Sequence, residues 1–377
     1  MSSTILPAPM PVNSLPAPIL QPAPQPRAIN RRKSGKHALF AAVSAAAALC
    51  VLAVVAFHGY IAWMLAHPYV APLYSNPMEA AGLPYEDTAF PSMSGRTTVG
   101  GWFIPAGDND GPQLAQTAAA ASQANESQRT VIFSHGYGAN REETWVPMYD
   151  LAALLHRLNY NVLMFDYGYA SSDYKAPATG GYEESQQLLA AVQYVKERGA
   201  SEIVVWGFSM GAGTALQAGL QTDDIDAMLL DSLFLPSPDT LFHNVTQVLP
   251  LPKYPSLPLI EMMLPAFTGT SFSGIPATEV MVKDYPIPLF IMHGTEDAKA
   301  PYEIADQIAH NQSNPLSQEW IVQGGKHELL FQVHAKEYIQ RAALFLSQVH
   351  QQHADANDST NGTNGTDGTS TADSIVL

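Results

Sequence analysis

An uninterrupted run of apolar residues at positions 38–57 constrains the architecture of this chain more than any other feature. The run carries no charge and is rich in Ala, Val and Leu. At 1.5 Å per residue, a helix of this length spans roughly the 30 Å hydrocarbon layer of a bilayer. Tyr60 and Trp63 follow where an interfacial aromatic belt would lie, and Pro68 provides a stop. The run therefore predicts a transmembrane helix over residues 37–66.

Two alternatives to an uncleaved anchor stay open. A cleaved signal peptide has a shorter apolar region, of about 7 to 15 residues, and a small-residue cleavage site, for which residues 54–56 are a passable candidate. A buried core helix would need a neighbouring domain, whereas this run is flanked by a basic cluster and a proline-rich arm. The length of the run favours the uncleaved anchor.

Charge is distributed unevenly along the 377 residues. Residues 1–36 contain proline at eight positions and five basic residues, and no Asp or Glu occurs before Glu79, which predicts a disordered basic arm. By the positive-inside rule this arm stays in the cytoplasm and the rest of the chain lies beyond the membrane, as a type II single-pass protein. The formal net charge of −16 gives a nucleic-acid partner no electrostatic support. Cys50, the single cysteine, provides neither an intrachain disulfide nor a CxxC zinc site.

After a linker at 67–77, apolar runs alternate with amphipathic ones, which predicts one α/β domain over residues 78–350. Most of the apolar runs are hydrophobic throughout, as is typical of parallel strands covered on both faces. The expected strands are 98–105, 130–134, 161–166, 203–206, 227–231, 289–293 and 319–323. Helical spacing is found at 145–157, 182–198, 211–218, 302–310 and 330–349.

Three stretches depart from this alternation. Residues 108–128 are polar and poor in large apolar side chains, which predicts a surface insertion. Residues 236–286 are proline-rich but too apolar for a solvated loop, so we interpret them as a cap region over a cleft. Residues 351–377 contain repeated Asn-Gly-Thr and are predicted to be a disordered tail.

The sequence GFSMG at 207–211 places a serine between two glycines, after an expected strand and before an Ala-rich helix. A serine on such a turn has strained dihedral angles, and the flanking glycines leave room for neighbouring elements. The helix N-terminus adds amide donors that stabilise developing negative charge. A G-x-S-x-G by itself is only a flexible turn, so it is the context that makes Ser209 a candidate nucleophile.

A serine nucleophile needs a base that takes its proton and an acid that orients the base. His327 follows the last expected strand and is the candidate base, because the other late histidines lie on expected helices or in the tail. Asp297, after the strand at 289–293, is the candidate acid. Asp231 is the alternative acid, and its purely structural role would be to cap the next turn or helix.

Six short motifs occur in an order that resembles the α/β-hydrolase superfamily, over about residues 78 to 350. They are GWFIP at 101–105, HGYG at 135–138, DY at 166–167, GFSMG at 207–211, HGTED at 293–297 and GKH at 325–327. The chain looks most similar to small-cap, often membrane-anchored hydrolases, which include palmitoyl-thioesterase-like and serine-aminopeptidase-like members. The resemblance implies an α/β-hydrolase fold, with a mostly parallel central sheet flanked by helices and a short cap.

Carried over to this sequence, the resemblance implies Ser209 as nucleophile with Asp297 and His327 as its partners. The backbone amides of Tyr137 and Met210 would form the oxyanion hole.

Two further residues, His135 and Asp166, would be structural. Members of the superfamily often continue Asp-Tyr into Arg-Gly-Tyr-Gly, whereas this chain reads DYGYAS at 166–171. The loop near the pocket therefore differs from that of such members. This difference weakens an inference of the substrate from the resemblance more than an inference of the reaction.

These patterns predict a membrane-anchored serine hydrolase that cleaves carboxylic ester or thioester bonds of a small-molecule or acyl substrate through an acyl-enzyme. No metal or organic cofactor is expected. A serine peptidase or amidase stays open, as does a catalytically silent, membrane-tethered binding module. Apolar residues of the cap could line an acyl site or simply pack on the core: Leu233, Phe234, Leu241, Phe242, Leu249, Leu251, Met262, Met263 and Phe267.

Overall fold

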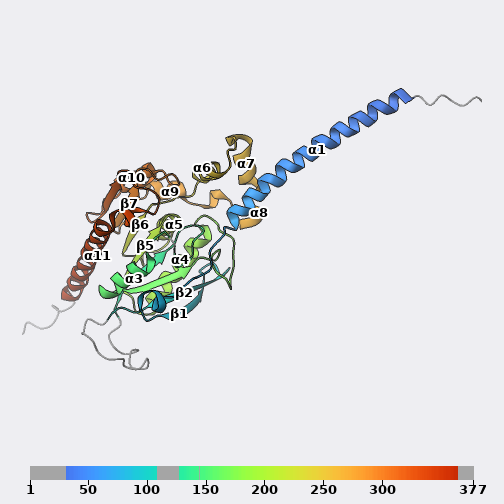
Figure 1. Cartoon of the computed structure of the whole chain (residues 1–377). Coiled ribbons are helices and arrows are strands. Elements are labelled where there is room, and N and C mark those ends of the chain that lie inside the picture. The colour runs from blue at the N-terminus through green and yellow to red at the C-terminus, as the bar shows by residue number, and fades with distance from the viewer. Residues whose placement is uncertain (1–30, 108–126, 144, 364–377) are drawn as a thin grey trace, which may run out of the picture. The chain divides into compact units, whose positions relative to one another are not determined.

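The computed structural model describes residues 31–107, 127–143 and 145–363 (Figure 1). Most of the predicted basic arm, nearly all of the predicted insertion at 108–128 and the end of the predicted tail lie outside these ranges. The chain divides into two compact units, Met1–Val54 and Val55–Leu377. Helix α1 (Arg31–Ala66) begins in the first unit, and its last residues belong to the second.

Helix α1 is long and apolar enough to span a membrane over Gly35–Ala66. The side chains of residues 35–57 are exposed, which is inconsistent with the core-helix alternative. The helix begins at Arg31, so the prediction that residues 31–36 belong to a disordered arm is wrong. Arg and Lys are good helix formers, and adding a turn to an existing helix avoids the cost of nucleation.

An eight-stranded sheet forms the centre of the second unit, in the order β1-β2-β4-β3-β5-β6-β7-β8. The six strands from β4 to β8 in this order are parallel to one another. At the other edge, β2 is antiparallel to both of its neighbours, β1 and β4. All the predicted strands are present, and a short polar edge strand, β1, is added. The strands are β1 (Glu86–Pro91), β2 (Thr98–Ile104), β3 (Arg129–Ser134), β4 (Asn161–Asp166), β5 (Glu202–Phe208), β6 (Ala227–Asp231), β7 (Leu289–Gly294) and β8 (Gln318–Val322).

Helices cover both faces of this sheet and give it two separate apolar layers. One layer contains side chains of α4 (Tyr182–Glu197), α5 (Met210–Gly219) and α10 (Tyr302–His310). The other contains side chains of α3 (Met148–Arg157) and α11 (Leu330–Thr363). Because the central strands are buried on both faces, their sequences are hydrophobic throughout. This is the α/β-hydrolase architecture that the sequence predicts.

The stretch 236–286 forms a group of short helices. A third apolar cluster joins residues of α6 and α7 to Ile61 and Ala62 of α1, all within the second unit. The helices are α6 (Pro238–Val248), α7 (Lys253–Met263), α8 (Pro265–Thr268), a 3₁₀ turn at Phe272–Gly274 and α9 (Ala277–Val282). A further short helix, α2 (Pro77–Ala81), lies in the segment between α1 and β1.

The last helix is longer than the sequence indicates. It continues to Thr363, so the predicted disordered tail is wrong for residues 351–363. His350 Nδ1 lies 2.6 Å from Glu202 Oε2, and His353 Nε2 lies 4.0 Å from Asp226 Oδ1. These pairs and the cooperativity of helix propagation extend the helix beyond its last apolar contacts.

Candidate active site

Ser209 lies on the turn between β5 and α5, with φ 52° and ψ −118°. The two glycines of the motif are required there by close backbone contacts. A Cβ at Gly207 would lie 2.6 Å from the Cα of Ala212, and one at Gly211 would overlap the carbonyl oxygen of Ser134. The turn therefore holds the serine in an unfavourable backbone conformation that the surrounding packing maintains.

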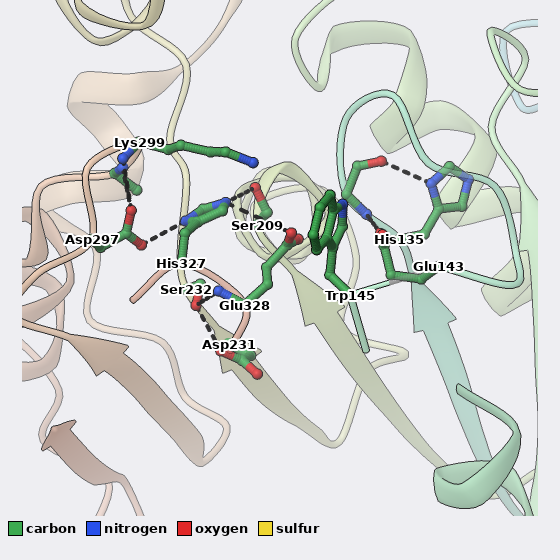
Figure 2. Close-up of polar contacts among 12 residues, drawn as sticks. His135, Glu143, Trp145, Ser209, Asp231, Ser232, Asp297, Lys299, His327 and Glu328 are labelled. Carbon is green, nitrogen blue, oxygen red and sulfur yellow. Dashed lines mark hydrogen bonds and ion pairs between the residues drawn. The ribbon is translucent and has the colours of Figure 1, made fainter. Parts of the chain in front are cut away.

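The structure brings the predicted nucleophile, base and acid into one hydrogen-bonded chain (Figure 2). His327 Nε2 lies 2.8 Å from Ser209 Oγ, and His327 Nδ1 lies 2.6 Å from Asp297 Oδ2. Asp297 follows β7, and His327 lies in the loop between β8 and α11. Because β5 and β7 are parallel members of one sheet, the loops after them meet at the same edge.

The carboxylate of Asp297 accepts hydrogen bonds on both of its oxygens. Oδ1 accepts from the amides of Lys299 and Ala300, at 2.8 Å each. Oδ2 lies 3.1 Å from Nε2 of the buried His293, in addition to its bond with His327. Burial would raise the pKa of Asp297, but the hydrogen bonds from His293 and His327 outweigh it and hold this pKa below its ordinary value. The group is therefore an anion that orients the imidazole of His327.

The alternative acid, Asp231, makes no hydrogen bond to His327. Its Oδ2 accepts from the hydroxyl of Tyr338 at 2.8 Å, and its Oδ1 accepts from the hydroxyl of Ser232 at 2.8 Å. Burial raises its pKa above the ordinary value. The arrangement indicates a structural carboxyl beneath the site rather than the partner of the histidine.

Both predicted oxyanion residues, Tyr137 and Met210, line one cavity with Ser209. Met210 is the first residue of α5, so its amide has no acceptor within the helix. The hydroxyl of Tyr137 donates to the carbonyl oxygen of Leu65 at 2.8 Å, which fixes the ring against the end of α1.

His135 and Asp166 hold the loop that carries Tyr137. His135 Nε2 accepts from the amide of Tyr167 at 3.1 Å, and Nδ1 donates to the carbonyl oxygen of Gly136 at 2.9 Å. Burial lowers the pKa of His135 to about 4, so the ring is neutral. Asp166 accepts from the backbone amide and the guanidinium of Arg141, at 2.7 Å each. Both residues thus have structural hydrogen-bond partners.

Two buried carboxyl groups beside Ser209 were not singled out from the sequence. The Glu328 side chain reaches to within 4.0 Å of His327 Nε2, and Glu143 Oε2 accepts from the amide of Gly136 at 3.1 Å. Burial, followed by repulsion from Glu143, raises the pKa of Glu328 well above its ordinary value. The one sequence signal for Glu328 is its place directly after the candidate base, and no motif marks Glu143.

A cavity of about 820 Å³ extends from Ser209 and His327. Of the nine cap residues named from the sequence, Phe234, Leu241 and Leu249 line this cavity. The other six do not line it, and most of them have the alternative role of packing in apolar clusters, as Leu233 and Phe242 do.

One group of three side chains in the described ranges could bring metal ligands together. Asp306, His310 and Glu319 have ligand atoms within 4.8 Å of one another, but two of the three are exposed. None of them lines the cavity at Ser209, so this group has no part in the site.

Comparison with known proteins places this site in a family. The family model described as "Alpha/beta hydrolase family" matches residues 131–341. Two relatives named "Uncharacterized protein YfhR", from Escherichia coli O157:H7 and from strain K12, are each 25% identical over 226 residues. These residues make up 59% of this chain and 66% of each relative, so the chain spans just under two thirds of their length.

Solved structures share the fold. The esterase Pf2001 of Pyrococcus furiosus superposes with a TM-score of 0.55 at 23% identity, covering 74% of this chain and 98% of the esterase. The α/β-hydrolase GrgF of Penicillium sp. sh18 has a TM-score of 0.50 at 17% identity, covering 71% and 99%. At these identities the likeness establishes the fold.

Proposed function

Because this chain belongs to the alpha/beta hydrolase family, we propose that it is a serine hydrolase that cleaves carboxylic ester or thioester bonds through an acyl-enzyme. The observation that carries the proposal is the unbroken hydrogen-bond chain from Asp297 through His327 to Ser209, at 2.6 and 2.8 Å. Such a chain converts a weak hydroxyl nucleophile into a reactive one. Family membership supports hydrolase activity, and the geometry supports the assignment of the nucleophile.

Each triad residue then has a defined task. His327 Nε2 takes the proton of Ser209 as the oxygen attacks the substrate carbonyl carbon. The anionic Asp297 keeps the other proton on Nδ1 and stabilises the imidazolium that forms. The imidazolium gives its proton to the leaving alcohol or thiol. Water, activated by the same histidine, then releases the acid and regenerates Ser209.

The negative oxygen of the tetrahedral intermediate needs preorganised donors. The amides of Tyr137 and Met210 are the proposed pair, since both residues line the cavity beside Ser209. Met210 contributes its amide from the N-terminus of α5, where the helix dipole also favours negative charge. Removal of one such donor typically costs about 10²- to 10³-fold in kcat.

Turnover of a substrate panel tests this function. The full chain in detergent micelles should hydrolyse p-nitrophenyl esters or acyl thioesters, and Ser209→Ala should lose at least about 10⁴-fold in kcat. If aminoacyl anilides are the preferred substrates, the enzyme is a peptidase or amidase instead. If no member of the panel is turned over, the fold serves as a binding module and the proposed hydrolysis is wrong.

We also propose that α1 anchors the enzyme as a type II single-pass protein with the active site on the exocytoplasmic side. The helix is long and apolar enough to span a bilayer, and five basic residues with no acidic ones precede its apolar run. Protease added to sealed cells should cleave the catalytic domain. If the domain is protected until the membrane is permeabilised, the orientation is the opposite one.

A further inference from the structure

The cavity at Ser209 is partly walled by the end of the anchor helix itself. Its lining includes Tyr60, Trp63 and Leu65 of α1 together with Ser209 and His327. All of these residues belong to the second compact unit, Val55–Leu377. The last turns of α1 therefore form a wall of the active site.

This end of α1 is firmly attached to the catalytic unit. Ile61 and Ala62 are buried in an apolar cluster with side chains of α6 and α7. The carbonyl oxygen of Leu65 accepts from the hydroxyl of Tyr137 at 2.8 Å, and that of Ala66 accepts from the amide of Ala178 at 2.7 Å. Tyr137 is also one of the proposed oxyanion residues, so the anchor contacts the catalytic machinery directly.

The position of this wall along the chain places it at the bilayer surface. Phe57 is the last residue of the apolar run, and Tyr60 is the first residue that lines the cavity. Three residues of chain reach at most about 11 Å, whatever the arrangement of the two units. A bilayer that holds the run at 38–57 therefore ends within about 11 Å of Tyr60, where the cavity wall begins.

The rim of the cavity exposes apolar side chains that suit such a surface. Among the lining residues, Trp63 is 43% exposed, Tyr69 is 84% exposed and Val248 is 79% exposed. Aromatic residues at the ends of a membrane span lie at the level of the lipid headgroups. Exposed apolar side chains that gather at the mouth of a cavity mark a binding surface.

Acidic and basic side chains in the cavity are confined to the end at Ser209 and His327. Apart from histidine, the lining residues with a carboxyl or amine group are Glu143, Lys299 and Glu328, and Figure 2 shows Lys299 and Glu328 beside Ser209 and His327. The remaining lining residues are mostly apolar, from α1, the segment that follows it and the cap. At about 820 Å³, the cavity lies in the upper part of the 300–1,000 Å³ range of small-molecule sites. This volume and polarity suit a long acyl chain whose carbonyl group is held at Ser209.

We propose that the substrates are long-chain acyl esters of lipids that reside in the same membrane as the anchor, with the acyl chain bound against α1 and the cap. This inference rests on the proposed serine hydrolase function. Ser209 Oγ forms a bond to the acyl carbon, the bond to the lipid alcohol oxygen breaks, and that oxygen takes the proton from His327. Water then cleaves the acyl-enzyme, so ester and water yield fatty acid and alcohol.

The first test uses chain length. The full chain in phosphatidylcholine vesicles is given p-nitrophenyl esters from four to sixteen carbons. Each methylene that enters the cavity should raise kcat/KM by up to about four-fold, until the cavity is filled. A kcat/KM that is flat or falls with chain length, with short esters still hydrolysed, overturns this inference and leaves the proposed function intact. If no ester is hydrolysed at any length, the proposed function itself fails.

A matched pair of variants locates the acyl site. Val248→Glu places a charge at the rim of the cavity, whereas Val333→Glu places one on α11, where Val333 is 70% exposed and does not line the cavity. Val248→Glu should lower the ratio of sixteen-carbon to four-carbon activity by at least about ten-fold, because an acyl chain does not tolerate an adjacent carboxylate. Val333→Glu should leave this ratio unchanged. Equal ratios in both variants contradict the assignment.

The second test asks where the substrate comes from. A fluorogenic long-chain glyceride is placed either in the vesicles that carry the enzyme or in separate vesicles. Hydrolysis should be at least about ten-fold faster in the shared membrane, since the cavity wall is tied to the bilayer of its own anchor. Equal rates contradict the proposal that the substrate comes from the membrane that holds the anchor. Faster hydrolysis of an S-acylated peptide than of the glyceride also overturns the proposal, because the substrate would then be a lipidated protein.

Discussion

Replacement of Asp297 by asparagine puts a donor in place of Oδ2, which faces His327 and His293, and leaves the hydrogen bonds to Oδ1 in place. Oδ1 of this residue accepts from two backbone amides, those of Lys299 and Ala300. Because these amides only donate, the amide oxygen of the asparagine must stay on their side. Its NH₂ group then faces His327, where Oδ2 now accepts at 2.6 Å.

The consequence is the wrong tautomer of the imidazole. Nδ1 of His327 would have to accept from the NH₂ group, and its proton would move to Nε2, the atom that must take the proton of Ser209. A triad with this substitution typically loses about 10⁴ in kcat, which corresponds to about 5.4 kcal/mol of transition-state stabilisation. We expect Asp297→Asn to lower kcat on a p-nitrophenyl ester by this factor.

Asp231→Asn is the matched control, since Asp231 is also buried. Its two oxygens accept from the hydroxyls of Tyr338 and Ser232, and a hydroxyl can rotate to accept from an amide instead. We therefore expect kcat to change by less than about ten-fold, with the main effect on the thermal midpoint. The reasoning is refuted if Asp297→Asn retains more than a tenth of the wild-type kcat. It is also refuted if Asp231→Asn lowers kcat more than Asp297→Asn does.

Three further changes separate chemistry from stability. Ser209→Ala should abolish turnover and leave the thermal midpoint nearly unchanged, as a melting curve of the full chain will show. Glu328→Gln should stabilise the fold above about pH 4.5, by up to about 1.4 kcal/mol for each pH unit. The reason is that the raised pKa keeps Glu328 protonated in the folded state, whereas the same group ionises in the unfolded chain. A gain in unfolding free energy that is the same at pH 4 and pH 7 in denaturant titrations contradicts this. Gly211→Ala should destabilise the protein by more than about 1–3 kcal/mol, since its Cβ would overlap the backbone of Ser134, and an unchanged unfolding midpoint argues against this packing.

The sequence predicts the central strands and the choice of Ser209, Asp297 and His327 as members of one site. Buried parallel strands are hydrophobic throughout, and polar residues that follow them lie at one edge of the sheet, so order and spacing predict the geometry. The edge strand β1 was not predicted, because its sequence EDTAFP is polar and largely exposed. Alternation carries little information in a six-residue strand of which only Phe90 is buried.

Contacts between distant segments could not be predicted in the same way. The wall that Trp63 and Leu65 contribute to the cavity depends on how the end of α1 packs against the cap, and no local pattern encodes that contact. The carboxyl of Glu328 was missed because its proximity to Glu143 arises only when two loops meet. The extension of α11 beyond residue 350 rests on pairs such as His350 with Glu202, which lie far apart in sequence.

The central claim is that Ser209 is an activated nucleophile. The most direct measurement is covalent labelling of the full chain with a fluorophosphonate, followed by peptide mapping of the adduct. The account predicts a single phosphonylated residue, Ser209, with labelling lost in Ser209→Ala and strongly slowed in Asp297→Asn. A folded protein that does not react, or an adduct on any other serine, would contradict the account.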